Sequence, residues 1–235
     1  MLANTSANTT STHSKSDRKV LLLDFDGVVV RNVHLARYQN QRSARFVQLH
    51  TKMELKECER LNAKYYPRFG HTVTMLNEMF GKDVSLASYQ EFVFCKKAMR
   101  DLDEFFYHKS RHHTREFGEL FDYCASNDVA CSIFTNAHPE WVSHFTALSG
   151  LGMDDTPVVF PETLAELKPN LAAYQKAAAI LGGNGGETAG SYVFVDDSAI
   201  NLDVAEKEFG WKPFLFGRDH SATSIVELLR SQRTM

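Results

Sequence analysis

The chain has 235 residues, of which 43% are hydrophobic and 23% are charged, and its formal net charge is −3. This length suffices for one large domain or for a domain with an insert. A slight acidic excess argues against a protein that coats a nucleic-acid polymer, because neutralising phosphates requires a basic excess. The longest apolar runs are far shorter than the roughly 18 residues that a membrane span needs, so we also expect no membrane contact.

The first residues and the cysteines bear on the compartment. Residues 1–17 contain ten Ser, Thr or Asn residues and no apolar signal core, which predicts a disordered tail. The four cysteines form no CxxC pair and lie in apolar or helical stretches, which is typical of reduced core thiols. We therefore expect a reducing compartment, the cytoplasm.

Short apolar runs that end abruptly in polar residues predict buried parallel strands. Residues 20–23, 129–134 and 192–195 have this form, and residues 158–160 and 214–216 are shorter candidates. Apolar residues at helical spacing lie between them, over residues 117–124, 141–148, 171–181 and 200–204. This alternation predicts an α/β fold, a Rossmann-like parallel sheet covered by helices on both faces.

Residues 31–113 interrupt the alternation with at least three helical patterns and no convincing strand. Apolar spacing predicts helices over residues 55–65 and 92–106. The insert should lie above the carboxyl edge of the sheet, where ligands bind. Its residues 31–70 hold nine Lys or Arg against three Asp or Glu. These charges indicate either a solvated helix face or a positive potential toward an anionic substrate.

Carboxylates follow two of the predicted strands. Asp24 and Asp26 are two residues apart, so both can face one crevice, and Gly27 lets the chain turn away. Asp196 and Asp197 end a different strand. Carboxylates gathered at one sheet edge repel one another, and a hard divalent cation with oxygen ligands would hold them ionised. The sequence therefore predicts a Mg²⁺ site.

Two further polar positions complete a series of four motifs. Thr135 and Asn136 follow a predicted strand, and Lys168 precedes Pro169 just before a predicted helix. Residues 24–27, 135–136, 168–169 and 196–198 with Asn201 resemble, in this order, the motifs of the haloacid dehalogenase (HAD) superfamily of phosphotransferases. The resemblance implies an α/β core formed by residues 18–30 and 114–235 and a helical cap formed by residues 31–113.

A narrower likeness concerns the substrate. Residues 61–70 and 134–137 are similar to the pyrimidine 5′-nucleotidase branch of this superfamily, which carries a helical cap. That branch usually has Asn-Thr-Leu-Tyr or similar after its Asp-x-Asp, whereas Gly27 and three valines follow here. The likeness implies a nucleoside 5′-monophosphate as substrate. Tyr65 and Tyr66 are the candidates for stacking on the base, and we assign Tyr65 to the substrate site. Helix packing within the insert is the alternative role for both.

The chemistry of phosphoryl transfer assigns the catalytic roles. Asp24 would be the nucleophile and would form an aspartyl-phosphate. Asp26 would protonate the leaving alkoxide and then deprotonate the water that hydrolyses the intermediate. Thr135, with the amide of Asn136, would bind the transferring oxygens, and Lys168 would bridge the nucleophile and the phosphoryl group.

The resemblance also implies the metal ligands. They would be the Asp24 carboxylate, the backbone carbonyl of Asp26 and the Asp197 carboxylate, with Asp196 reaching the metal through water. Ser198 and Asn201 would hold the loop that carries the two acids.

Several alternatives remain open at this point. A sugar-phosphate phosphatase, a phosphoglycolate phosphatase or a phosphomutase would use the same residues on another small phosphorylated metabolite. A haloacid dehalogenase is disfavoured because Asp26, the acid and base of the phosphotransferases, is present. A non-catalytic phosphate-binding module and a receiver-like phospho-acceptor domain are the alternatives from other classes. The oligomeric state is left without a prediction.

Overall fold

The computed structural model describes residues 19–96, 99–103, 111–151, 153, 156–182 and 192–231, and of residues 111–114 and 182 only the backbone. The tail predicted over residues 1–17 lies outside the described residues. Within them, the four cysteines are free thiols. No described helix is both long and apolar enough to cross a membrane.

Five parallel strands form one sheet in the order β3-β2-β1-β4-β5, which confirms the predicted α/β fold. In chain order the strands are β1 (Lys19–Leu23), β2 (Val129–Phe134), β3 (Val158–Val159), β4 (Tyr192–Asp196) and β5 (Lys212–Leu215). The first strand is central because it pairs with both β2 and β4. Its carboxyl end therefore lies between the ends of two other strands.

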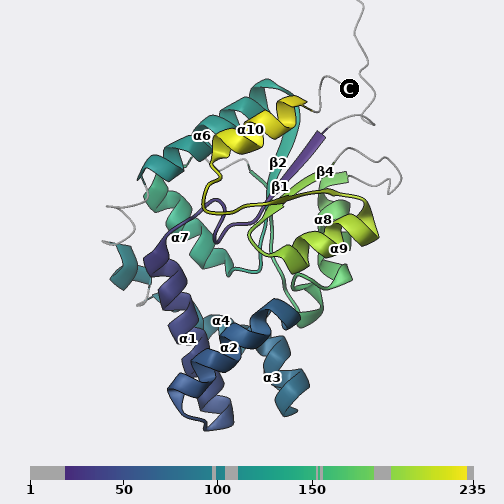
Figure 1. Ribbon diagram of the computed structural model, residues 1–235. Coiled ribbons are helices and arrows are strands. Elements are labelled where there is room, and N and C mark those ends of the chain that lie inside the picture. The colour runs from purple at the N-terminus through teal and green to yellow at the C-terminus, as the bar shows by residue number, and fades with distance from the viewer. Residues whose placement is uncertain are drawn as a thin grey trace, which may run out of the picture.

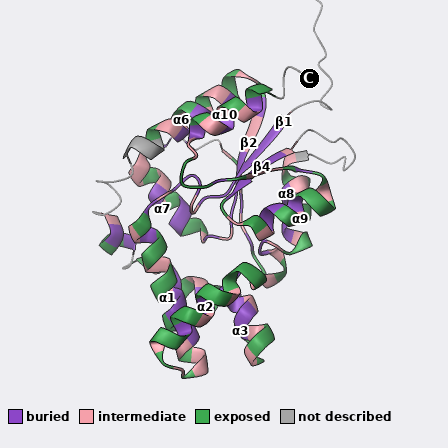
Figure 2. Cartoon of the chain, viewed as in Figure 1, coloured by how far each residue is buried: buried purple, intermediate pink, exposed green. Residues whose placement is uncertain are grey.

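Both faces of the sheet are buried (Figures 1 and 2). Leu21 and Leu23 belong to one apolar cluster, and Val20 and Leu22 belong to the other. The first cluster lies beneath α6 (Arg111–Ser126), α7 (Pro139–Ser149) and α10 (Ala222–Ser231), and the second beneath α8 (Leu171–Gly182) and α9 (Ala199–Phe209). Two covered faces explain why the strand is a continuous apolar run rather than an alternating one.

Four helices follow β1 and form a group beyond the sheet, at the bottom of Figure 1. They are α1 (Val33–Thr51), α2 (Leu55–Phe69), α3 (Thr72–Phe80) and α4 (Leu86–Val93). The expected helical cap inserted after the first strand is thus present. Its expected limits at residues 31 and 113 stay predictions, since residues 104–110 lie outside the described part.

The single helix predicted over residues 92–106 is interrupted at residues 94 and 95, and the described residues on either side are helical. Helix α4 ends at Val93, and Phe94 has a non-helical backbone with φ −105° and ψ 31°. The Phe94 side chain is buried, and its ring lies 5.0 Å from that of Trp141 and 6.4 Å from that of His138. Helical backbone resumes at Lys96 and is described again over residues 99–103. The apolar spacing therefore combined two segments that pack separately against the core.

Candidate active site

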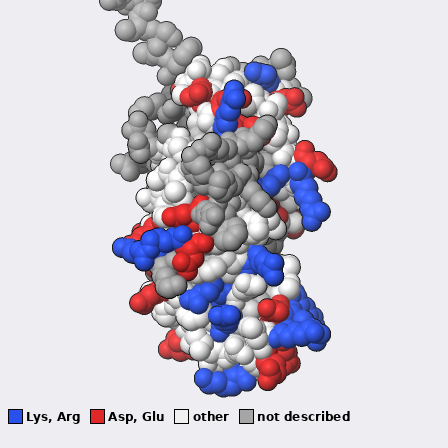
Figure 3. Space-filling view, turned by 90° about the vertical axis from the view of Figure 1, so that its left-hand side faces the viewer, with Lys and Arg blue, Asp and Glu red and all other residues white. Residues whose placement is uncertain are grey.

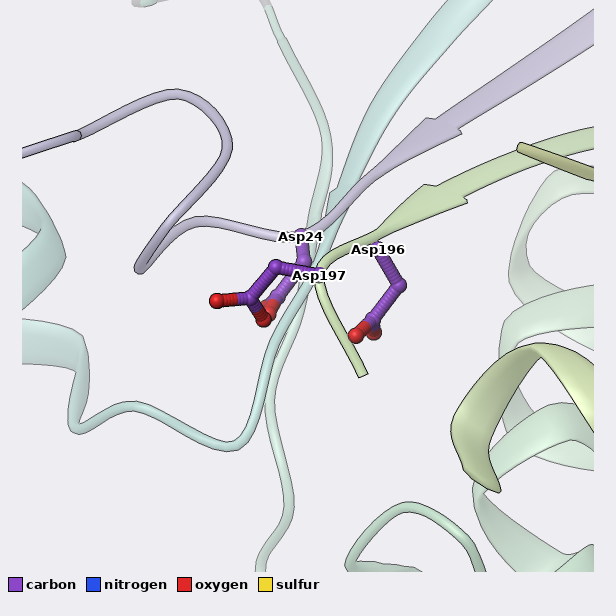
Figure 4. A group of neighbouring side chains, drawn as sticks. All are labelled: Asp24, Asp196 and Asp197. Carbon is purple, nitrogen blue, oxygen red and sulfur yellow. The ribbon is translucent and has the colours of Figure 1, made fainter. Parts of the chain in front are cut away.

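Polar side chains gather at the carboxyl ends of three adjacent strands. Asp24 follows β1, Thr135 follows β2 and Asp196 ends β4, and the parallel register brings these three ends level. Ligand atoms of Asp24, Asp196 and Asp197 all lie within 4.8 Å of one another (Figure 4). Three of the four predicted carboxylates therefore lie together, and Asp26 is not part of this group.

Lys168 lies between two of these acids. Its Nζ is 3.0 Å from Oδ1 of Asp24 and 2.7 Å from Oδ2 of Asp196, and it donates to the Phe134 carbonyl at 2.8 Å. Burial alone would lower the pKa of Lys168, but the charges of Asp196 and Asp24 outweigh it and raise that pKa. Lys168 is only 1% exposed, so the site holds a buried ammonium between two carboxylates.

Asn136 fixes the segment that carries this lysine. Its Nδ2 donates to the Lys168 carbonyl at 2.9 Å, and its Oδ1 accepts from the Lys168 backbone N–H at 2.8 Å. The side chain of Asn136 is thus engaged with the protein. Its backbone amide is the part that the predicted phosphate-binding role requires, and Asn136 and Thr135 both line the cavity described below.

The acids need positive charge beyond Lys168. Burial raises the pKa of Asp24 well above its usual value, Lys168 opposes this shift, and Asp196 and Asp197 add to it. Burial and the neighbouring Asp196 raise the pKa of Asp197 to about 6. A divalent cation would lower both pKa values by favouring the ionised forms.

The donor set fits Mg²⁺. The cluster offers hard carboxylate oxygens from Asp24 and Asp197, and the oxygens of Asp196 are already occupied by protein donors. Those donors are Lys168, the Ser198 backbone N–H at 2.8 Å and Nδ2 of Asn201 at 3.0 to 3.1 Å. A site with few free carboxylates leaves positions for water and phosphate, as Mg²⁺ prefers.

Gly27 allows Asp197 to approach the turn after β1. Its φ is +86°, and a Cβ at this position would lie 2.2 Å from Oδ2 of Asp197. Any other residue would both strain the backbone and displace the acid. The glycine after Asp-x-Asp is therefore a requirement of the carboxylate cluster as well as of the turn.

Two donors that the sequence did not predict hold Asp26. Nε1 of the buried Trp141, on α7, donates to Oδ1 of Asp26 at 3.1 Å, and the side chain of Gln39, on α1, also hydrogen-bonds to this carboxylate. Burial raises the pKa of Asp26, and these two hydrogen bonds oppose the shift. One donor comes from the core and the other from the cap, so Asp26 lies where the two meet.

A cavity of about 720 Å³ joins the acids to the cap. The core side contributes Asp24, Asp26, Asp197, Thr135, Asn136 and Lys168, and the cap side includes Gln39, Asn62, Tyr66 and His71. Tyr65, the residue predicted to stack on a base, is absent from the described lining. Its ring lies 6.3 Å from that of Phe69 in the apolar cluster, whereas the neighbouring Tyr66 lines the cavity and is 42% exposed.

Most basic side chains of residues 31–70 lie outside the lining of this cavity. Figure 3 shows Lys and Arg spread over the cap with Asp and Glu among them. Of these nine basic residues, all described, Arg31 alone lines the cavity. Its guanidinium donates to the carbonyls of Gly217, Arg218 and His220 and lies 4.5 Å from the centre of the Phe216 ring. A solvated face accounts for most of the charge.

No protein-family model and no curated protein matches this sequence. Among solved structures, a predicted HAD-like family hydrolase from Porphyromonas gingivalis matches with a TM-score of 0.51 and 16% identity, over 91% of this chain and 98% of that one. An L-2-haloacid dehalogenase from Xanthobacter autotrophicus matches with a TM-score of 0.45 and 13% identity, over 83% of this chain and 76% of that one. A phosphoserine phosphohydrolase-like protein from Francisella tularensis matches with a TM-score of 0.43 and 16% identity, over 81% of this chain and 83% of that one.

The first of these likenesses defines a class of fold. The chain has the α/β architecture of HAD-like hydrolases, as in the protein from Porphyromonas gingivalis. At these identities the likeness extends to the fold alone, so the activity has to be argued from the residues of the cavity.

Proposed function

We propose that this protein is a Mg²⁺-dependent phosphatase of the HAD superfamily that hydrolyses a small phosphomonoester through an aspartyl-phosphate. One observation carries the proposal: a buried ammonium, Lys168, contacts both Asp24 and Asp196 at the end of the central strand, beside a third carboxylate. Such a site places a cation against one carboxylate that faces a cavity, and positive charge at that position favours attack on an anionic phosphoryl group.

In the first half-reaction an Asp24 carboxylate oxygen bonds to phosphorus, and the bond from phosphorus to the ester oxygen breaks. The leaving oxygen takes its proton from Asp26, which Trp141 and Gln39 orient. Lys168 and the Thr135 region bind the transferring oxygens. In the second half-reaction Asp26 removes a proton from water, water oxygen bonds to phosphorus, and phosphate leaves with Asp24 restored.

The residues that would hold Mg²⁺ are the carboxylates of Asp24 and Asp197 and the backbone carbonyl of Asp26, with Asp196 acting through water. When bound, the ion would offset the charge of the phosphoryl group and of the clustered carboxylates. Asp26 also favours a phosphatase over a dehalogenase, because halide departure needs no proton donor whereas an alkoxide does.

A nucleoside 5′-monophosphate is the substrate we favour, as in the pyrimidine 5′-nucleotidase branch, and the cytoplasm is the proposed location. The cavity is large enough for a phosphorylated small metabolite, and Tyr66 supplies an aromatic side chain on the cap side. A sugar-phosphate or phosphoglycolate phosphatase and a phosphomutase are the competing substrate assignments.

A phosphate-release screen tests the proposal. Purified protein is incubated with nucleotides, sugar phosphates, phosphoglycolate and p-nitrophenyl phosphate, with Mg²⁺ or after exhaustive chelation. We expect release only with Mg²⁺, and inhibition by Ca²⁺, which favours looser and higher coordination. Full activity after chelation would refute the metal requirement, and no release from any ester would refute the phosphatase.

A further inference from the structure

We propose that the cap holds a second recognition site, in which Asn62 and His71 donate hydrogen bonds to an uncharged oxygen acceptor on the leaving group. This inference rests on the proposed function, because it assigns the cap side of the cavity whose core side would bind the phosphoryl group. It selects neutral, hydroxyl- or carbonyl-bearing leaving groups, such as nucleosides and sugars, over charged ones.

Asn62 has a fixed orientation. It lies on α2, is 5% exposed, and its Oδ1 accepts from Oγ1 of Thr72 at 2.9 Å. That bond leaves Nδ2, the donor end of the amide, for another partner. Asn62 lines the cavity, and no acceptor for its Nδ2 is found among the described residues.

His71 is oriented in the same way by the start of α3. Its Nδ1 accepts from the Val73 backbone N–H at 3.2 Å, so the neutral ring carries its proton on Nε2. The side chain is 5% exposed and lines the cavity, and the described part of the chain offers Nε2 no acceptor. The ring packs edge-on against Tyr89, with 4.7 Å between centres.

The two side chains are buried, but Asn62 Nδ2 and His71 Nε2 are not among the fully enclosed polar atoms that lack a partner, so both donors are open to the cavity and can meet an acceptor there. Water can serve in the free protein, and a ligand oxygen replaces it on binding. The two donors come from neighbouring positions in the fold, since Thr72, which orients Asn62, directly follows His71. They therefore act on one small region of a ligand.

The charge of the cap lining explains why the acceptor is uncharged. Of the cavity-lining residues that α1 to α4 supply in the described ranges, none carries a charge. The cations of the lining, Arg31, Lys168 and Arg218, lie outside these helices; three backbone carbonyls occupy Arg31, and Lys168 is paired with Asp24 and Asp196. A carboxylate on the leaving group would lose its hydration without meeting a cation on these helices.

Binding of leaving groups without phosphate tests this inference independently of turnover. Uridine, ribose, L-serine and glycolate are titrated onto the wild-type protein by NMR. We expect uridine or ribose to bind at least about tenfold more tightly than serine or glycolate, and preference between uridine and ribose distinguishes a base carbonyl from a sugar hydroxyl. Equal or tighter binding of the charged compounds, or no binding by any of the four, would overturn the inference. Absence of phosphate release in the screen would instead overturn the proposed function.

Two variants with matched controls assign the effect to these residues. His71→Asn keeps an acceptor for the Val73 N–H but withdraws the Nε2 donor, and Thr72→Val removes the hydroxyl that orients Asn62. Each should weaken binding of the preferred compound by about threefold to tenfold, the range for one neutral hydrogen bond. The controls are His50→Asn on α1 and Thr74→Val on α3, which lie outside the described lining and should leave the affinity unchanged. Unchanged affinity in folded Thr72→Val protein would refute the role of Asn62, whether or not His71→Asn folds.

Discussion

At the scale of single residues, the site combines one ammonium with several carboxylates in a buried setting. Lys168 can offset one negative charge, and Asp24, Asp196 and Asp197 supply up to three. Burial is the largest cause of the raised pKa values of Asp24 and Asp197, and the neighbouring carboxylates add to it. Asp26 has a different proposed role from the clustered acids, because its carboxylate is hydrogen-bonded to Trp141 and Gln39. This division suits one acid to attack and another to transfer protons.

Removing the proton donor should affect poor leaving groups most. We predict that Asp26→Ala lowers kcat/KM for a nucleoside 5′-phosphate by at least about a hundredfold, the usual contribution of general acid catalysis, and far less for p-nitrophenyl phosphate. Asp203→Ala, an exposed acid on α9 paired with Lys207, is the control. Steady-state kinetics on both esters check this, and equal losses would refute the acid role.

The two neighbouring tyrosines have different expected roles. Tyr66 lines the cavity and Tyr65 packs against Phe69, so Tyr66→Ala should raise KM for a nucleotide several-fold, while Tyr65→Ala should mainly lower the melting temperature. Kinetics and thermal unfolding of both variants separate these effects. A larger rise in KM for Tyr65→Ala than for Tyr66→Ala would restore the original assignment to Tyr65.

At the scale of elements, the end of α2 links the cap to the catalytic lysine. Gly70 ends this helix with φ +69°, and a Cβ there would lie 2.2 Å from Cδ of Pro169 and 3.0 Å from the Lys168 carbonyl oxygen. The next residue, His71, begins α3. One corner of the cap therefore contacts both the segment of Lys168 and the cavity, so its packing affects the chemistry.

Gly70→Ala should lower the free energy of unfolding more than Gly81→Ala does. Gly81 ends α3 with φ +58°, and a Cβ there would meet nothing within 4 Å, so Gly81→Ala should cost only about 1 kcal/mol for the left-handed backbone. Gly70→Ala adds the collision with Pro169 and should cost at least about 2 kcal/mol more, with reduced kcat/KM. Denaturant unfolding measures the difference, and equal losses would show that the contact with Pro169 does not constrain the cap.

The start of α3 should make the protein sensitive to acid. Burial lowers the pKa of His71 from 6.5 to about 4, so the unfolded chain binds this proton first as the pH falls. The associated stability, on the order of 3 kcal/mol, is fully present above pH 6.5 and is lost as the pH falls toward 4. His71→Asn removes the titration, so its unfolding free energy should fall less steeply than that of the wild type over this range. Parallel curves would contradict the assignment.

At the scale of the whole molecule, the cap and the core enclose the site together. A single apolar cluster runs from Leu23 of the sheet through Trp141 of α7 to Phe46 and Val73 of the cap. Arg31, where the chain leaves the core, is bound to the loop after β5. The cavity therefore lies at a packed junction, where cap residues can select a leaving group and core residues can act on phosphorus.

The sheet and its acidic edge were predictable from the sequence because the signals are local. A buried strand covered on both faces is a continuous apolar run, and the acids follow such runs directly. The helix predicted over residues 92–106 is interrupted because the backbone leaves the helical conformation at Phe94, whose ring packs against Trp141 and His138, while the apolar residues on either side still follow helical spacing. The spacing of apolar residues indicates which side chains are buried, but it does not show whether they belong to one helix or to two.

Contacts between distant elements were not predictable in this way. The hydrogen bond from Trp141 to Asp26 joins residues 115 positions apart, and the sequence showed Trp141 only as part of an apolar helix face. At Tyr65 the spacing itself indicated packing, and the nucleotidase likeness suggested base contact. Adjacent residues on a helix point in directions about 100° apart, so Tyr66 faces the cavity when Tyr65 faces the core.

The most direct test of the central claim is to trap the covalent intermediate. The wild-type protein is mixed with a hydrolysed ester and Mg²⁺, quenched in acid within one turnover, digested and analysed by mass spectrometry. We predict a phosphoryl group on Asp24, absent from Asp24→Asn protein, which should also lose at least about a thousandfold in turnover. Wild-type turnover without any phosphoryl group on Asp24, or more than about a tenth of wild-type activity in folded Asp24→Asn protein, would contradict the account.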